Sequence, residues 1–137
     1  MAIRFHSEKI SFNVGEKNRL KKWITACIRV HGKDPGAINF IFTSNEQILH
    51  MNREYLNHSY FTDVISFDYS DKELVSGDIF ISVDQVRANA GHFGTEFLEE
   101  LRRVMIHGIL HLTGFGDDSR EEKIVMRQME NEALNLW

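Results

Sequence analysis

The sequence predicts an α+β fold, close to α/β, in which a small four-stranded mixed sheet packs with about five helices. Two observations lead to this prediction. Short runs rich in β-branched and aromatic residues alternate with longer segments whose apolar residues recur at helical spacing. The early strands are separated by segments long enough to be crossover helices. With 137 residues, of which 42% are hydrophobic, the chain is expected to form a single domain over residues 1–137.

Four segments carry the strand pattern. Each is short, contains β-branched or aromatic residues at high density, and is bounded by polar or turn-forming residues. In chain order they are residues 3–6, 37–43, 64–69 and 77–82, and the last two are joined by the turn-rich segment 70–76.

Five segments are expected to be helical. A Ser-x-x-Gln or Ser-x-x-Glu capping box at Ser44, Ser82 and Ser119 predicts where three of them begin, because the serine oxygen can accept from the backbone three residues later. Thr95 is expected to cap the long helix that follows it, and Gly32 is placed to end the first helix. The expected helices are residues 16–30, 45 to about 55, 83 to near Gly91 or Gly94, 96 to about 113, and 120 to about 136.

Charge and composition narrow the function classes. The net charge of −4 with neutral histidines is not the basic footprint of a typical nucleic-acid-binding protein, so an RNA substrate would have to be bound by a local patch and a metal ion. No apolar run approaches the ~20 residues that cross a membrane, and the first residues lack the apolar core of a signal peptide. A cytoplasmic protein without membrane contact is therefore expected. The single cysteine, Cys27, excludes an internal disulfide and is expected to be a buried, inert thiol.

The segment HGILHLTGFGD, residues 107–117, carries the chemistry. His107 and His111 are four residues apart, so on a helix their Cβ atoms lie on one face, about 5–6 Å apart, and both imidazoles can bind one metal ion. Gly114 stands where the helix should end and can take the left-handed conformation that reverses the chain. The reversal can return Asp117 to the histidines as a third, anionic ligand.

The spacing favours Asp117 over its neighbour Asp118, which is expected to be an outer hydrogen-bond partner or part of the polar turn. Two histidines on one helical face are often only partners of polar neighbours, but the added glycine and carboxylate favour a metal site. Three protein ligands leave the fourth position open for water, as in catalytic zinc sites. The ion would lower the pKa of that water and polarise the scissile group.

The ligand spacing is close to that of the metzincin proteases, with one difference. Those enzymes have a glutamate, the general base, directly after the first histidine, and here that residue is Gly108. Glycine inside a helix is destabilising by about 1 kcal/mol relative to alanine. Gly108 is therefore expected to leave room for a bulky substrate group or for a closely packed neighbour.

Arg103 lies one helical turn before His107, and these two are the candidate catalytic residues. Arg103 could meet a phosphate near the metal, or it could form an ion pair with Glu99 or Glu100 on the helix surface. The remaining histidines are scattered, and surface or structural roles are expected for each of them: His6, His31, His50, His58 and His92.

Four motifs in order resemble the YbeY family of rRNA maturation factors. They are HGILHLTG at residues 107–114, MNREY at 51–55 (family LNxxYR), TDVISF at 62–67 (family TDVLSF) and GDIFIS at 77–82 (family GDIVIS). The resemblance implies a small mixed sheet with surrounding helices and a metal-dependent endoribonuclease directed at single strands. Such proteins act in 16S rRNA 3′-end maturation and ribosome quality control in the bacterial cytoplasm, with zinc bound. The implied partners are single-stranded RNA, 16S rRNA and the small ribosomal subunit.

The sequence departs from the family pattern at two places. The family motif usually ends in a third histidine, where this chain has Asp117, and the preceding aspartate is Gly116. A carboxylate ligand would weaken the Lewis acidity of the ion and broaden the choice of metal to Mn, Ni or Fe. The family has an arginine implicated in catalysis at the position of Leu56, so Arg53 or Arg103 would have to supply the positive charge. Asp63 and Ser66, within a matching motif, are adequately explained by strand-edge capping and turn hydrogen bonds.

Three functions therefore remain open. The leading hypothesis is metal-assisted cleavage of RNA, with one Zn²⁺ per chain held by His107, His111 and Asp117. A zincin-type metallopeptidase is suggested by the ligand spacing and disfavoured by Gly108. A non-catalytic ribosome-assembly factor with a structural metal is supported by Leu56 and by the negative net charge.

Overall fold

The computed structural model describes residues 2–55 and 62–137. Its elements follow in chain order β1 (Ala2–Ser7), α1 (Lys17–Val30), β2 (Asp34–Thr43), α2 (Asn45–Tyr55), β3 (Val64–Asp68), β4 (Leu74–Ser82), α3 (Val83–Phe93), α4 (Phe97–Thr113) and α5 (Arg120–Leu134). Four strands and five helices in the described residues confirm the predicted α+β class.

The sheet has the strand order β1-β2-β4-β3. β1, β2 and β4 run parallel, with Phe5 beside Phe40 and Phe40 beside Ile79, and α1 is the crossover between the first two strands. β3 is antiparallel to β4, and the short segment between them makes a hairpin. The sheet is therefore mixed, as predicted.

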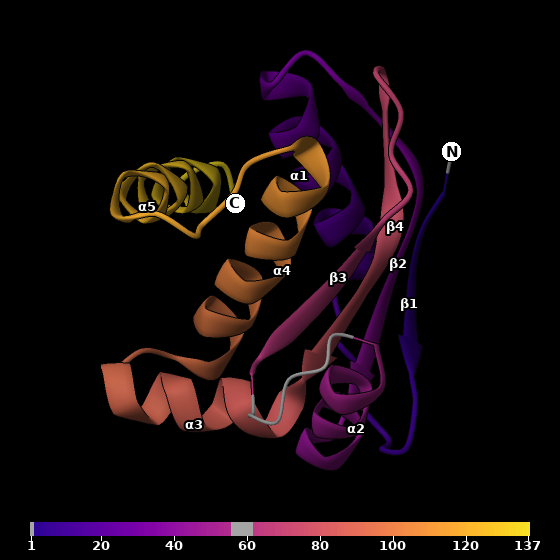
Figure 1. The fold of residues 1–137 in the computed structure, drawn as a ribbon, viewed down its shortest axis with the longest axis vertical. Coiled ribbons are helices and arrows are strands. Elements are labelled where there is room, and N and C mark those ends of the chain that lie inside the picture. Colours follow the sequence, from indigo (N-terminus) through magenta and orange to yellow (C-terminus); the bar gives the residue numbers. More distant parts are fainter. Residues whose placement is uncertain (1, 56–61) are drawn as a thin grey trace.

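Alternate residues of the strands supply two cores. Ile79 and Ile81 of β4 face α1 and α4 in the main core, whereas Phe80 faces α2 together with Ile65 of β3. In Figure 1, α4 lies between α5 and the sheet, and α2 and α3 lie at one end of the molecule. Cys27 is buried in the main core, and burial raises the pKa of its thiol to about 12, so an inert thiol is the right description.

The helix starts agree with the capping boxes and differ at one place. Ser119 shows both halves of the box with Glu122, and the Ser82 oxygen accepts from the Gln85 amide. Thr95, expected to cap α4, is not its cap, and its amide donates to the Ala90 carbonyl at 3.0 Å in the turn that ends α3. The cap position of α4 falls on Glu96 instead.

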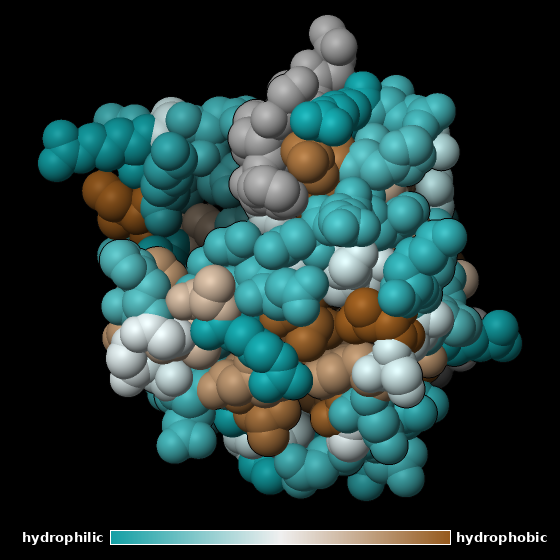
Figure 2. All heavy atoms as spheres, turned by 90° about the horizontal axis from the view of Figure 1, so that it is seen from below, coloured by the Kyte–Doolittle hydropathy of each residue, from teal (hydrophilic) through white to brown (hydrophobic). Residues whose placement is uncertain are grey.

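The face seen in Figure 2, from the side of α2 and α3, is mostly hydrophilic, and its hydrophobic atoms lie in limited patches among polar ones. Within residues 2–55 and 62–137, no helix has the length and apolar character needed to cross a bilayer.

Gly108 lets α4 approach the sheet closely. A Cβ at this position would lie 2.8 Å from Ile79 Cγ2 and 3.3 Å from Ser66 Oγ. Gly108 was expected to make room either for a substrate group or for a closely packed neighbour. The structure shows the neighbour, because core residues occupy the space beside this glycine.

Gly108→Ala is expected to lower the free energy of unfolding. Overpacking a buried site destabilises a protein by about 1–3 kcal/mol. Because the added Cβ would meet two atoms of Ile79 and one of Ser66, this loss should exceed the gain of about 1 kcal/mol from replacing glycine by alanine in a helix. Gly91→Ala in α3 is the matched control, because nothing lies within 4 Å of the added Cβ, and it should stabilise. Urea unfolding measures both, and an equal or greater stability of Gly108→Ala would contradict the packing role.

Candidate metal centre

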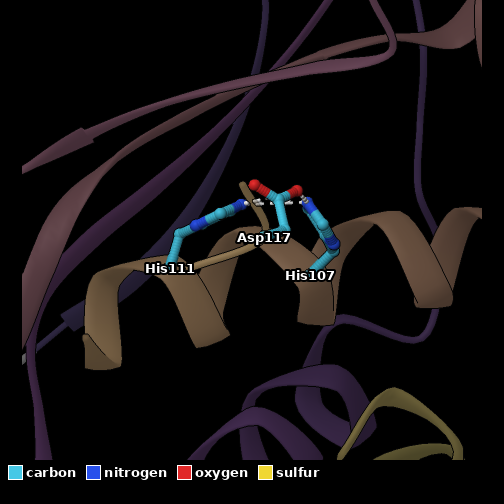
Figure 3. A group of neighbouring side chains, drawn as sticks. All are labelled: His107, His111 and Asp117. Carbon is cyan, nitrogen blue, oxygen red and sulfur yellow. Dashed lines mark hydrogen bonds and ion pairs between the residues drawn. The ribbon is translucent and has the colours of Figure 1, made fainter. Parts of the chain in front are cut away.

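The last two turns of α4 and the turn after them form one group of side chains. His107 and His111 project from the same face of α4, and Gly114 ends the helix in the left-handed conformation at φ 111°. The chain then reverses and brings the Asp117 carboxylate between the two imidazoles (Figure 3). The bend expected at Gly114 is thus present, and the group contains Asp117, while Asp118 is exposed and outside it.

The three donor atoms have the spacing that one small cation requires. His107 Nε2 lies 3.0 Å from His111 Nε2, and Asp117 Oδ2 lies 3.3 and 3.4 Å from these two nitrogens. Ligands at about 2.0–2.2 Å from a tetrahedral ion stand about 3.3–3.6 Å apart, close to these three separations. Two imidazoles and one carboxylate are also a common donor set for a catalytic transition metal. The group therefore fits a divalent ion.

The ligand atoms remain accessible to solvent. The side chains of His107, His111 and Asp117 are 22%, 29% and 36% exposed. Three protein donors would leave at least one position of a tetrahedral ion free for water or substrate. The arrangement suits a reactive site better than a closed structural one.

Glu130 of α5 holds the far side of the first histidine. Its Oε2 lies 2.7 Å from His107 Nδ1, and its side chain is only 7% exposed. An ionised carboxylate can only accept a hydrogen bond, so Nδ1 carries the proton and donates. In the neutral imidazole the lone pair is then on Nε2, the atom that faces His111 and Asp117.

His107 and Glu130 shift each other's pKa toward the charged form. Burial lowers the pKa of His107, but the hydrogen bond and the negative charge of Glu130, with the charge of Asp117, outweigh burial and raise that pKa above its usual value. Burial raises the pKa of Glu130, but the hydrogen bonds from His107 and Arg103 outweigh it and lower that pKa. Glu130 is therefore ionised at neutral pH.

Arg103 belongs to the same buried network. Its Nη1 donates to Glu130 Oε1 at 3.0 Å and its Nη2 donates to Asn131 Oδ1 at 2.8 Å. Arg103 therefore forms its ion pair with Glu130 of α5, and not with Glu99 or Glu100 as expected. The side chain is only 19% exposed.

The metal group lies where two clefts meet. The first, named the α5 cleft, has a volume of about 430 Å³ and is lined by α3, α4 and α5, including Phe93, Arg103, Lys123 and Arg127. The second, named the β3 cleft, has a volume of about 540 Å³ and is lined by Thr62 to Ser66, Asp68 and His111. His107, Asp117 and Asp63 line both clefts. An elongated substrate can therefore pass across the group.

Asp63 stands at this junction and is partly buried. Its Oδ2 accepts from Asn89 Nδ2 at 3.1 Å, and its carbonyl accepts from the Ser82 amide at 2.9 Å. Burial raises the pKa of its carboxyl group, and the positive charge of His107 opposes that rise without cancelling it. These bonds support the structural role expected for Asp63.

The remaining predicted residues lie elsewhere. His50 pairs with Glu54 on α2, His6 contacts Asn39 on the sheet, and His31 stacks edge-on against Phe115. Arg53 is exposed on α2 and is not among the residues that line either cleft. Leu56 and His58 lie outside the described residues.

Glu130 is the residue that inspection of the sequence missed. Spacing rules cover contacts within a few residues, whereas Glu130 is 23 positions from His107. One signal was available: Met126, Glu130 and Ala133 form the buried stripe of α5, and a carboxylate on such a stripe needs a charged or donating partner.

Comparison with known proteins supports one family. The family model described as "Endoribonuclease YbeY" matches residues 2–137. The endoribonuclease YbeY of Parabacteroides distasonis is 47% identical over 99% of this chain and 96% of its own length, and that of Bacteroides thetaiotaomicron is 44% identical over 99% of both. The solution structure of a protein from Thermotoga maritima is similar with a TM-score of 0.67 and 29% identity, over 99% of this chain and 91% of that one.

These matches confirm the family predicted from the four motifs and the enzyme class that it implied, a metal-dependent endoribonuclease. Nearly the whole chain is covered, as is nearly the whole length of each relative. The chain therefore belongs to the endoribonuclease YbeY family.

Proposed function

We propose that this chain cleaves single-stranded RNA during 16S rRNA 3′-end maturation, with one divalent ion held by His107, His111 and Asp117. The observation that carries the proposal is the spacing of the three donor atoms, all within 4.8 Å of one another, where two clefts meet. Zn²⁺ is the ion that the donor set suits best, and the carboxylate ligand also admits Mn, Ni or Fe. Single-stranded rRNA of the small ribosomal subunit is the proposed partner, and the cytoplasm is where this substrate is found.

The residues of the site have two roles, binding the ion and positioning its ligands. His107 and His111 offer neutral imidazole nitrogens, and Asp117 offers a negative oxygen that compensates part of the charge of the ion. Glu130 fixes the proton of His107 on Nδ1 and Arg103 keeps Glu130 in place, so both are positioning residues. A divalent ion bound there supplies Lewis acidity to the scissile phosphodiester and lowers the pKa of the attacking hydroxyl group or water.

A metallopeptidase of the zincin type fits the site less well. Its general base would stand at position 108, where the structure has a glycine packed against Ile79 and Ser66. A glutamate there would have to displace the core of the sheet. The ligand spacing alone therefore does not support peptide hydrolysis.

His111→Ala is expected to lower the rate of RNA cleavage by more than about a hundredfold, because loss of only an outer partner of a ligand already costs about 10–100-fold. Cleavage of a single-stranded rRNA fragment, followed on a gel with and without chelator, measures this. His50→Ala, at an exposed histidine of α2, is the matched control and should keep full activity.

The other functions predict different results in the same assay. Cleavage of casein by the wild type would favour the peptidase. Cleavage of neither substrate, with metal-dependent thermal stability and sedimentation with ribosomes, would favour an assembly factor. Undiminished RNA cleavage by His111→Ala would contradict the proposed ligand set.

Glu130→Gln is expected to weaken metal affinity by about tenfold, because a neutral amide holds the His107 proton less firmly than a carboxylate does. Competition with a chromophoric chelator measures the affinity, and circular dichroism shows whether the fold is retained. Glu121→Gln, in the exposed first turn of the same helix, is the control and should bind as the wild type does. An unchanged affinity in Glu130→Gln would remove Glu130 from the positioning role.

A further inference from the structure

The two clefts beside the metal group differ in charge. The described lining of the α5 cleft has three lysine or arginine side chains, Arg103, Lys123 and Arg127, beside four carboxylates, those of Asp63, Glu100, Asp117 and Glu130. The described lining of the β3 cleft has three carboxylates, those of Asp63, Asp68 and Asp117, and no lysine or arginine, so only the α5 side offers cations against its acidic groups. A polyanion that crosses the metal group is therefore attracted to the α5 side.

Arg103 is not free to attract it. Its guanidinium is bound to Glu130 and Asn131 and is largely buried, so a phosphate would have to compete with an ion pair that is already made. Its contribution is to the orientation of Glu130. The cations available to a ligand in this cleft are the other two.

Lys123 and Arg127 are exposed and aligned. They are four residues apart on α5, so their side chains leave the same helical face about 5–6 Å apart, and both line the cleft. The Arg127 side chain is 60% exposed, and its contact with the Glu130 carboxylate, from Nη1 to Oε1, is long at 3.9 Å. Glu130 already accepts hydrogen bonds from Arg103 and His107. The guanidinium of Arg127 is therefore available to bind an anionic ligand.

An aromatic ring stands across the same cleft. Phe93, the last residue of α3, lines it and is 60% exposed, which is unusual for a phenylalanine of the chain's own core. Exposed rings beside a cationic groove are the platforms on which single-stranded bases stack, because every base has a π face. The cleft thus combines a ring for a base with two cations for the backbone.

We propose that Lys123 and Arg127 bind backbone phosphates of single-stranded RNA on the α5 side of the metal group, with a base stacked on Phe93. This rests on the proposed function for the identity of the ligand. It explains how a chain of net charge −4 can bind RNA.

The test measures binding of a fluorescent single-stranded 2′-O-methyl RNA oligonucleotide to the metal-loaded protein at several salt concentrations. The double variant Lys123→Gln/Arg127→Gln removes two cations that would each contact a phosphate. It should reduce the slope of log affinity against log salt by about 1.4, and weaken binding on the order of ten- to a hundredfold at 50 mM salt. Phe93→Leu should weaken binding with the slope unchanged, because stacking releases no counterions. Arg127→Lys, which keeps the charge, should keep the slope.

The matched control is Lys17→Gln/Lys21→Gln, which removes the same charge from two exposed lysines at the same spacing on α1. An equal slope in the α5 double variant and the wild type, with both folded by circular dichroism, would overturn the inference even if RNA is cleaved. An equal loss of slope in the α1 control would overturn it too, since the effect would then be one of net charge. RNA binding with the expected slopes but without cleavage would leave the α5 cleft standing and remove the proposed activity.

Discussion

Helix α4 has to approach the sheet more closely than any side chain at position 108 would allow. Ile79 and Ser66 occupy the space into which a Cβ of residue 108 would project, so glycine is what permits this packing. Because the interior is close-packed, the contact fixes how α4 is turned about its own axis. His107, the neighbour of that glycine, is thereby held at the edge of the sheet, where both clefts open.

The end of α4 and the buried face of α5 complete the arrangement. Ser70 Oγ and Lys33 Nζ donate to the carbonyls of Leu112 and Thr113, each at 3.0 Å, so the last turn is anchored where the chain reverses. On the other side of α4, Glu130 of α5 holds the imidazole of His107. The same helix α5 thus supplies orientation from its buried face and positive charge from its exposed face.

The parts of the site that were predictable from sequence are those governed by local rules. The glycine reversal at Gly114 and the capping box at Ser119 depend on residues a few positions apart, and both were expected. Thr95 is not the cap because α4 begins at Phe97, which puts the cap position on Glu96, while Thr95 belongs to the turn that ends α3. The contact of Glu130 with His107 joins two helices, and its partner could not be chosen before the packing of α5 on α4 was known.

A helix end and a chain reversal bring two imidazoles and one carboxylate to the spacing that a single divalent ion requires. Metal content by mass spectrometry tests this arrangement most directly when wild type, Asp117→Ala and Asp118→Ala are purified in the same way. One ion per chain is expected in the wild type and in Asp118→Ala, and none in Asp117→Ala. Equal metal content in all three proteins would exclude Asp117 from the ligands of the ion.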